Sequence, residues 1–225
     1  MNAADSPPTS AVRIQAREIV IDGDLVLPEA AAGLVIFAHG SGSSRFSRRN
    51  RTVADVLVEG GFATLLLDLL TREEEAVDQY TGQFRFDIDR LAERVIAAID
   101  WAGDQRELAP LPIGCFGAST GAAAALMAAA ARPARVRAVI SRGGRPDLAG
   151  DALPRVEAPT LLIVGGHDES VIELNEEARR RLRVRSQTTI VPGATHLFQE
   201  PGTLERVARL ALEWCQLYLR NSRRV

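Results

Sequence analysis

The chain has 225 residues, of which 46% are hydrophobic and 25% charged, and these values fit one globular α/β domain with a large core. Its formal net charge of -2 gives no electrostatic basis for binding nucleic acid or an anionic membrane. All 27 basic residues are arginine. Chemistry that depends on a lysine, such as a Schiff base or a phosphate-binding P-loop, is therefore excluded.

The beginning of the chain and the cysteines bear on location and bound groups. Residues 1–11 are mostly polar and small, and we expect a flexible tail there, followed by a single domain over residues 12–225. The sequence shows neither a secretory leader nor an apolar run that could span a bilayer, so we expect a cytoplasmic protein without a membrane partner. Cys115 and Cys215 lie in apolar patterns without metal-ligand spacing, which indicates buried thiols.

The apolar pattern predicts a parallel sheet covered by helices. Val12–Leu27 alternates loosely and is predicted to be an antiparallel hairpin that turns at Asp22-Gly23-Asp24. Later apolar runs do not alternate, which is typical of strands buried on both faces. These runs are Leu34–Ala38, Ala63–Leu67, Pro112–Phe116, Val136–Ile140, Thr160–Val164 and Thr188–Val191. The helices predicted between and after them are Asn50–Glu59, Phe86–Trp101, Thr120–Ala131, Glu173–Leu182 and Thr203–Leu219. Thr71–Arg85 is a long polar connection that we expect to cover part of a site.

The sharpest chemical motif is Gly117-Ala118-Ser119-Thr120-Gly121, which matches G-x-S-x-G. It follows a predicted strand and precedes an alanine-rich predicted helix, which is the context in which this motif forms a tight turn that exposes a nucleophilic serine. The alternative is a helix start in which Ser119 only caps the helix.

A serine hydroxyl needs an adjacent base, and the chain has three histidines. His39, His167 and His196 each follow a predicted strand, so all are expected at the carboxyl edge of the sheet, where ligands bind. The chain order Ser, Asp, His selects His196 as the base and Asp168 as the acid that orients it. The alternatives are a surface-loop role for His196 and a helix-cap or turn role for Asp168. We expect His39 to hold its own loop and Asp68 to anchor a loop.

The same edge carries further candidate residues. The backbone N–H groups of Thr120 and Ser41 are predicted to form the oxyanion hole, with Gly40 letting the backbone approach the substrate. Arg142 and Arg145, after the strand Val136–Ile140, are candidate clamps for a substrate carboxylate or phosphate. Surface exposure, or pairing with the acidic 73–75 stretch, is the other interpretation of these arginines.

Together, the loop 39–44, the motif 117–121, Gly165-Gly166-His167-Asp168 and Gly193-Ala194-Thr195-His196 resemble the dienelactone-hydrolase-like branch of the α/β-hydrolase superfamily. The resemblance implies a mostly parallel eight-stranded sheet with helices on both faces, little or no cap domain, an ester-cleaving activity, no cofactor and no metal. Dienelactone hydrolases proper carry a cysteine nucleophile, whereas this chain has Ser119. The prediction is therefore a serine carboxylesterase.

Three classes of function remain open from the sequence. The first is hydrolysis of small carboxylic esters by Ser119, His196 and Asp168 through an acyl-enzyme, with a small-molecule ester as the only partner and a monomer or homodimer as the assembly. The second is a thioesterase, lactonase or acyl transferase that uses the same three residues. The third is a binding protein without activity on a hydrolase scaffold. The natural substrate is not predicted.

Overall fold

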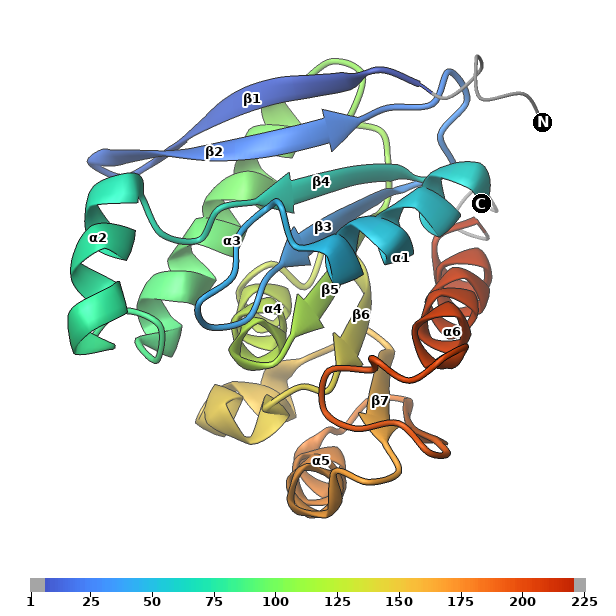
Figure 1. Ribbon diagram of the computed structural model, residues 1–225. Helices are drawn as coiled ribbons and strands as arrows, with labels where there is room; N and C mark the ends of the chain where they lie inside the picture. Colours follow the sequence, from blue (N-terminus) through green and yellow to red (C-terminus); the bar gives the residue numbers. More distant parts are fainter. Residues whose placement is uncertain (1–6, 221–225) are drawn as a thin grey trace.

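One eight-stranded sheet runs through the residues that this computed structural model describes, 7–220 (Figure 1). The strands are β1 (Thr9–Ala16), β2 (Ile19–Val26), β3 (Leu34–Ala38), β4 (Ala63–Leu67), β5 (Ile113–Ala118), β6 (Val136–Arg142), β7 (Thr160–Gly165) and β8 (Ser186–Val191). Their order across the sheet is β1-β2-β4-β3-β5-β6-β7-β8. The strands from β3 to β8 are mutually parallel, whereas β1 and β2 pair antiparallel.

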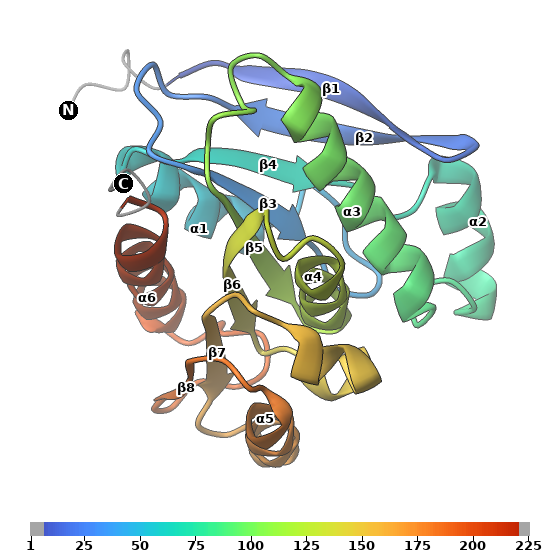
Figure 2. The same ribbon diagram turned by 180° about the vertical axis from the view of Figure 1, so that it is seen from behind.

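Helices cover both faces of this sheet (Figures 1 and 2). They are α1 (Arg48–Glu59), α2 (Arg72–Thr81), α3 (Ile88–Asp104), α4 (Thr120–Ala131), the 3-10 helix η1 (Pro146–Arg155), α5 (Glu169–Arg181) and α6 (Thr203–Tyr218). Figure 2 shows α3 and α4 on one face, with α1 and α6 on the other. The predicted fold class is confirmed, and within residues 7–220 the chain forms no separate cap domain.

Each face of the sheet has its own apolar core because the central strands are buried on both sides. Strands β3, β4 and β5 contain no exposed or half-buried residue. One core joins the sheet to α3 and α4, and the other joins it to α1 and α6. Helix α4 is almost entirely alanine, so its backbone can lie very close to the strands. The parallel arrangement brings the carboxyl ends of six strands to one edge.

The predicted hairpin exists, but the predicted position of its turn is wrong. The chain turns at Arg17 and Glu18, where Arg17 has a φ of 54°. Gly23 lies inside β2, opposite Val12 on one side and Leu67 on the other. A Cβ on Gly23 would lie 3.1 Å from the side chains of Val12 and Leu65. This glycine therefore allows close packing in a strand and does not form a turn.

Further features also differ from the sequence-based expectations. Of the expected tail over residues 1–11, residues 1–6 lie outside the described residues, and Thr9–Ala11 belong to β1. The polar stretch Thr71–Arg85 contains α2, which begins with a capping box between Thr71 and Glu74. The 3-10 helix η1 was not predicted, because Pro154 and the left-handed Gly150 interrupt any helical pattern.

Candidate active site

Ser119 lies in a strained turn between β5 and α4. Its backbone angles are φ 50° and ψ -123°, a conformation that costs a residue with a side chain about 1–3 kcal/mol. Backbone hydrogen bonds hold it: Ser119 N–H donates to Arg142 O (3.3 Å), and Arg145 N–H donates to Ser119 O (3.0 Å). The Ser119 side chain makes no helix-capping hydrogen bond. The cap interpretation of Ser119 therefore fails.

Two glycines make this turn sterically feasible. A Cβ on Gly117 would lie 2.4 Å from Ala122 Cα, and a Cβ on Gly121 would lie 2.3 Å from Ala38 O. Both distances are far shorter than any side chain tolerates. The glycines of the G-x-S-x-G motif are thus required by contacts with α4 and with the end of β3.

Asp168 and His196 meet across the carboxyl ends of β7 and β8. His196 Nδ1 lies 2.6 Å from Asp168 Oδ2, and Asp168 occupies the N-cap position of α5 without capping it. A carboxylate accepts, so Nδ1 carries the proton and Nε2 is left as the free acceptor. The Asp168 side chain is 13% exposed and that of His196 is 38% exposed. This leaves the imidazole open to a substrate.

Backbone contacts and one glutamate position the His196 loop. A Cβ on Gly165 would lie 2.5 Å from Ala194 O, so the loops after β7 and β8 lie backbone against backbone. Glu200 accepts from both Thr195 N–H (3.1 Å) and Thr195 Oγ1 (2.6 Å). These hydrogen bonds lower the pKa of Glu200. Glu200 could not be predicted from the sequence, because its partner Thr195 becomes recognisable only once the loop is folded.

Gly143 connects the serine and histidine parts of this edge. It directly follows Arg142, whose carbonyl accepts from Ser119 N–H, and a Cβ on it would lie 3.0 Å from His196 O and 3.6 Å from His196 Nδ1. Within residues 7–220, Ser119 Oγ makes no side-chain hydrogen bond with His196. Such bonds are often long in a free enzyme and tighten when substrate binds.

The predicted oxyanion residues lie together beside Ser119. Ser41 Oγ is 3.0 Å from Thr120 Oγ1, and neither backbone N–H donates to another backbone group in the described range. A Cβ on Gly40 would lie 2.9 Å from Ser119 Cβ, so only a glycine lets this loop approach Ser119. The Ser41 hydroxyl also donates to Arg85 O (3.3 Å).

The stretch after α2 braces that loop, a role the sequence did not reveal in detail. The buried Asp78 accepts from Arg85 Nε (2.6 Å) and from the backbone N–H groups of Phe84 and Arg85. The chain is thereby fixed where Arg85 O meets Ser41. Helix α2 and the 42–46 loop also border a cavity of about 480 Å³.

His39 and Asp68 hold the loop after β3, as expected. Leu69 N–H donates to His39 Nε2 (2.9 Å), so Nδ1 carries the proton and donates to Gly40 O (2.9 Å). Burial lowers the pKa of His39, against smaller opposing effects of Gly40 and Asp68. Arg45 donates its backbone N–H to Asp68 Oδ1 (2.8 Å), and its guanidinium pairs with the same carboxylate. His39 is therefore a neutral structural group and not a second base.

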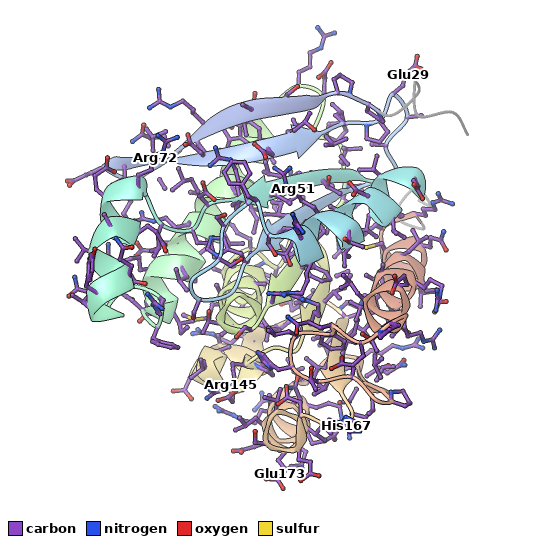
Figure 3. The ribbon with its side chains drawn as sticks, in the orientation of Figure 1. Glu29, Arg51, Arg72, Arg145, His167 and Glu173 are labelled. Atoms are coloured by element: carbon purple, nitrogen blue, oxygen red, sulfur yellow. The ribbon has the colours of Figure 1, made fainter. Side chains whose placement is uncertain are left out.

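The two candidate clamp arginines point to different elements. Arg142 is 7% exposed and donates to Asn50 of α1 (Nη2 to Oδ1, 3.3 Å). Arg145 lies beside η1 (Figure 3) and pairs in bidentate fashion with Asp147 at 2.9 and 2.8 Å. The structure therefore does not form one clamp from both. Within residues 7–220, neither arginine pairs with the acidic 73–75 stretch, because Glu74 pairs with Arg90 and Arg94, and Arg145 pairs with Asp147.

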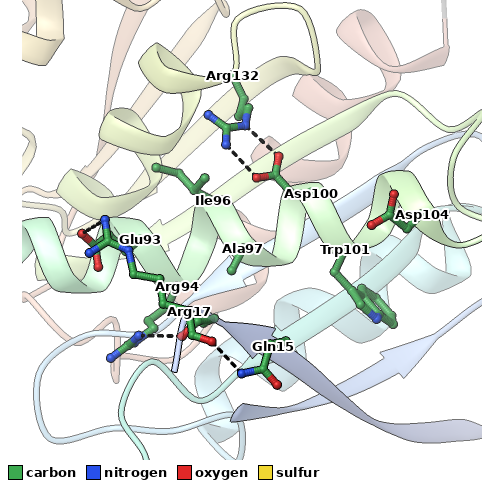
Figure 4. Close-up of a pocket in the computed structure, with 11 residues that line it drawn as sticks. Gln15, Arg17, Glu93, Arg94, Ile96, Ala97, Asp100, Trp101, Asp104 and Arg132 are labelled. Carbon is green, nitrogen blue, oxygen red and sulfur yellow. Dashed lines mark hydrogen bonds and ion pairs between the residues drawn. The ribbon is translucent and has the colours of Figure 1, made fainter. Parts of the chain in front are cut away.

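Other candidate features lie elsewhere or are inert. Cys115 and Cys215 are buried and unpaired, and burial raises the pKa of Cys115 to about 12, so neither is a nucleophile. A cavity of about 530 Å³ between β1 and α3 is lined by both apolar and charged side chains, and two pairs of the charged ones, Arg132 with Asp100 and Arg17 with Glu93, form ion pairs (Figure 4). Within residues 7–220, no cluster of three acidic, histidine or cysteine side chains could hold a metal. None of the helices there combines the length and apolar character that a bilayer crossing requires.

Comparison with known proteins agrees with this geometry. The sequence pattern of the dienelactone hydrolase family matches residues 21–216. The chain belongs to the dienelactone hydrolase family. The crystal structure of a dienelactone hydrolase from Anabaena variabilis superposes with a TM-score of 0.94 at 55% identity, over 96% of this chain and 100% of that one. This chain therefore shares both the sequence pattern and the fold of a family of hydrolases.

More distant and longer relatives widen the comparison. Est1E from Butyrivibrio proteoclasticus superposes with a TM-score of 0.74 at 19% identity, over 91% of this chain and 98% of that one, which shows a shared fold. Two curated proteins of Mycobacterium tuberculosis are 56% identical over 216 residues, or 95% of this chain. They carry the provisional name of phosphoribosyl transferase. This chain spans 48% of their length.

Proposed function

We propose that this family member is a serine carboxylesterase that cleaves small esters. The observation that supports it best is the hydrogen bond between His196 Nδ1 and Asp168 Oδ2 at the same edge as the strained Ser119. Asp168 stands at the N-cap position of α5, but its carboxylate binds the imidazole of His196 and does not cap the helix. This is the arrangement in which a carboxylate orients a catalytic histidine. The name of the longer relatives describes proteins of about twice this length and does not decide the activity of this part.

The proposed reaction follows from the three side chains. Ser119 Oγ attacks the ester carbonyl carbon while His196 Nε2 takes the hydroxyl proton, and Asp168 stabilises the resulting imidazolium. The N–H groups of Ser41 and Thr120 stabilise the oxyanion. The C–O bond to the alcohol breaks, and His196 protonates the departing alkoxide. Water, deprotonated by His196, then attacks the acyl-enzyme and releases the carboxylic acid and free Ser119.

A thioesterase, lactonase or acyl transferase would use the same steps with a different leaving group or acceptor. Hydrolysis and transfer are separated by adding an alcohol in excess and measuring the share of new ester among the products. A binding protein without activity is the remaining alternative, and a fluorophosphonate probe separates it from an enzyme. An activated Ser119 is expected to be labelled, whereas a serine without a functioning base is not.

The decisive experiment replaces Ser119 with alanine. We expect Ser119→Ala to lower kcat for 4-nitrophenyl acetate by about 10⁴-fold or more and to abolish fluorophosphonate labelling. The matched control is Ser170→Ala, since Ser170 is exposed in the first turn of α5; this variant should keep both signals. Undiminished turnover in Ser119→Ala would refute the proposal.

A further inference from the structure

Arg142 is a buried cation without a carboxylate partner. Its side chain reaches Asn50 through Nη2, whereas Nε and Nη1 are buried and have no hydrogen-bond partner within residues 7–220. A guanidinium in this state is costly, because burial removes the water that would otherwise solvate its N–H groups. Such a group normally pairs with an anion.

Arg49 adds a second positive charge to the same place. Its Nε is also buried without a partner among the described residues. Burial, and then the nearby Arg49 charge, lowers the pKa of Arg142 to about 10, which still leaves it charged at neutral pH. No ion pair of either arginine occurs within residues 7–220. Asp24 and Asp68 pair with other arginines near the start of α1: both pair with Arg45, and Asp24 also pairs with Arg51.

The start of α1 reinforces this charge. Arg49 and Asn50 lie in its first turn, which contains no acidic residue. The N-terminus of a helix carries a partial positive charge and usually attracts carboxylates. The two guanidinium groups and the helix N-terminus therefore all contribute positive charge at this place. No acidic side chain in the described part of the chain forms an ion pair with either guanidinium.

The backbone of Arg142 links this cluster to the candidate nucleophile, Ser119. Arg142 accepts the Ser119 N–H through its own carbonyl, and Gly143 after it contacts the His196 loop. We propose that Arg49, Arg142 and Asn50 bind an anionic oxygen group, a carboxylate or phosphate, carried by the ester substrate. This specificity rests on the esterase function proposed above. Arg145 does not take part, since Asp147 already occupies its guanidinium.

Access to the cluster depends on Arg49. Its side chain is only partly buried, so a rotation of this long chain can admit an anion without unfolding α1. Arg142 is nearly enclosed, and its replacement could prevent folding. Arg49→Gln is therefore the informative variant. Arg48→Gln is its matched control, because Arg48 is exposed in the same turn and its loss changes the net charge equally.

The first arm measures binding without catalysis. Inorganic phosphate is added in increasing concentration to the Ser119→Ala variant at constant ionic strength, and the midpoint of thermal unfolding is measured. We expect saturable stabilisation, a Kd raised about tenfold by Arg49→Gln, which corresponds to the loss of one charge-assisted contact, and no change with Arg48→Gln. Absence of stabilisation, or equal weakening by both variants, would overturn the proposal.

The second arm identifies the source of the anion. The ratio of kcat/KM for 4-nitrophenyl hemisuccinate to that for 4-nitrophenyl butyrate should fall about tenfold in Arg49→Gln and stay constant in Arg48→Gln. If phosphate binding depends on Arg49 but this ratio does not change, the site holds a free anion and the substrate assignment is wrong. If neither ester is cleaved while phosphate still binds through Arg49, the esterase function fails separately.

Discussion

The serine side and the histidine side of the candidate site are held in place by different physical means. On the serine side, close backbone contacts decide the geometry: hypothetical Cβ atoms on Gly117 and Gly121 would come within 2.4 and 2.3 Å of neighbouring backbone atoms. On the histidine side, one close backbone contact, that of Gly165 with Ala194 O, is joined by side-chain hydrogen bonds. His196 Nδ1 donates to Asp168, and Thr195 Oγ1 donates to Glu200.

This difference fits the different tasks that we propose for the two sides. A nucleophile has to be presented in one conformation, and steric contacts fix it at no further entropic cost during the reaction. An imidazole that gains and loses a proton needs a partner that stabilises both states, which a carboxylate does. We therefore expect chemical changes to disable the histidine side and changes of shape to disable the serine side.

Among changes that keep Ser119, the largest effect is expected from removing the charge of Asp168. Asp168→Asn should lower kcat by about 10³–10⁴-fold, because an amide can hold the imidazole in the wrong tautomer and does not stabilise the imidazolium. The folded structure should persist, which circular dichroism would check. Glu169→Gln is the control, since Glu169 is the adjacent exposed acid. Equal losses in both variants would contradict the assignment of Asp168.

A shape change where the two sides meet should have a smaller effect. Gly143→Ala adds a Cβ 3.0 Å from His196 O, and we expect kcat to fall about 10- to 100-fold as the imidazole is displaced. Gly150→Ala is a matched control, because Gly150 has nearly the same φ (51° against 49°) but no atom within 4 Å of the added Cβ. Both variants should lose similar stability from backbone strain. Similar activity in the two would show that Gly143 does not position His196.

The smallest effect concerns stability on the serine side. His39 is neutral in the fold and its pKa lies below the usual value, chiefly because of burial. The unfolded chain therefore binds the proton more readily, and the stabilisation is complete above about pH 6.5 and declines as the pH falls toward the folded-state pKa. Urea unfolding at pH 7 and pH 5.5 should show a loss of up to about 1.4 kcal/mol per pH unit in the wild type.

The comparison protein for this measurement is His39→Gln, which cannot titrate. It should start less stable at pH 7 and lose less stability between the two pH values, since most carboxylates stay ionised above pH 5. His167 and His196 are common to both proteins. Parallel losses in the two proteins would show that His39 does not cause the pH dependence.

The sequence by itself determined the layered α/β fold and the order of the site residues along the chain. Short apolar runs without alternation, each followed by a helical pattern, indicated buried parallel strands, and Gly117–Gly121 indicated a tight strand-to-helix turn. These features depend on local pattern. The roles expected for His39 and Asp68 followed from their positions after strands and agree with their hydrogen bonds.

Only the tertiary structure decided the roles of residues whose contacts lie far away in the sequence. Gly23 has a turn-like sequence context, but it packs between Val12 and Leu65, and Glu200 gained a role because the folded loop brings Thr195 to it. Arg142 and Arg145 are equivalent in sequence, three residues apart, yet one is buried against Asn50 and the other pairs with Asp147. The energy of a buried charge depends on the direction of its side chain and on its partner. Both are set by how distant elements pack together, which the local sequence does not encode.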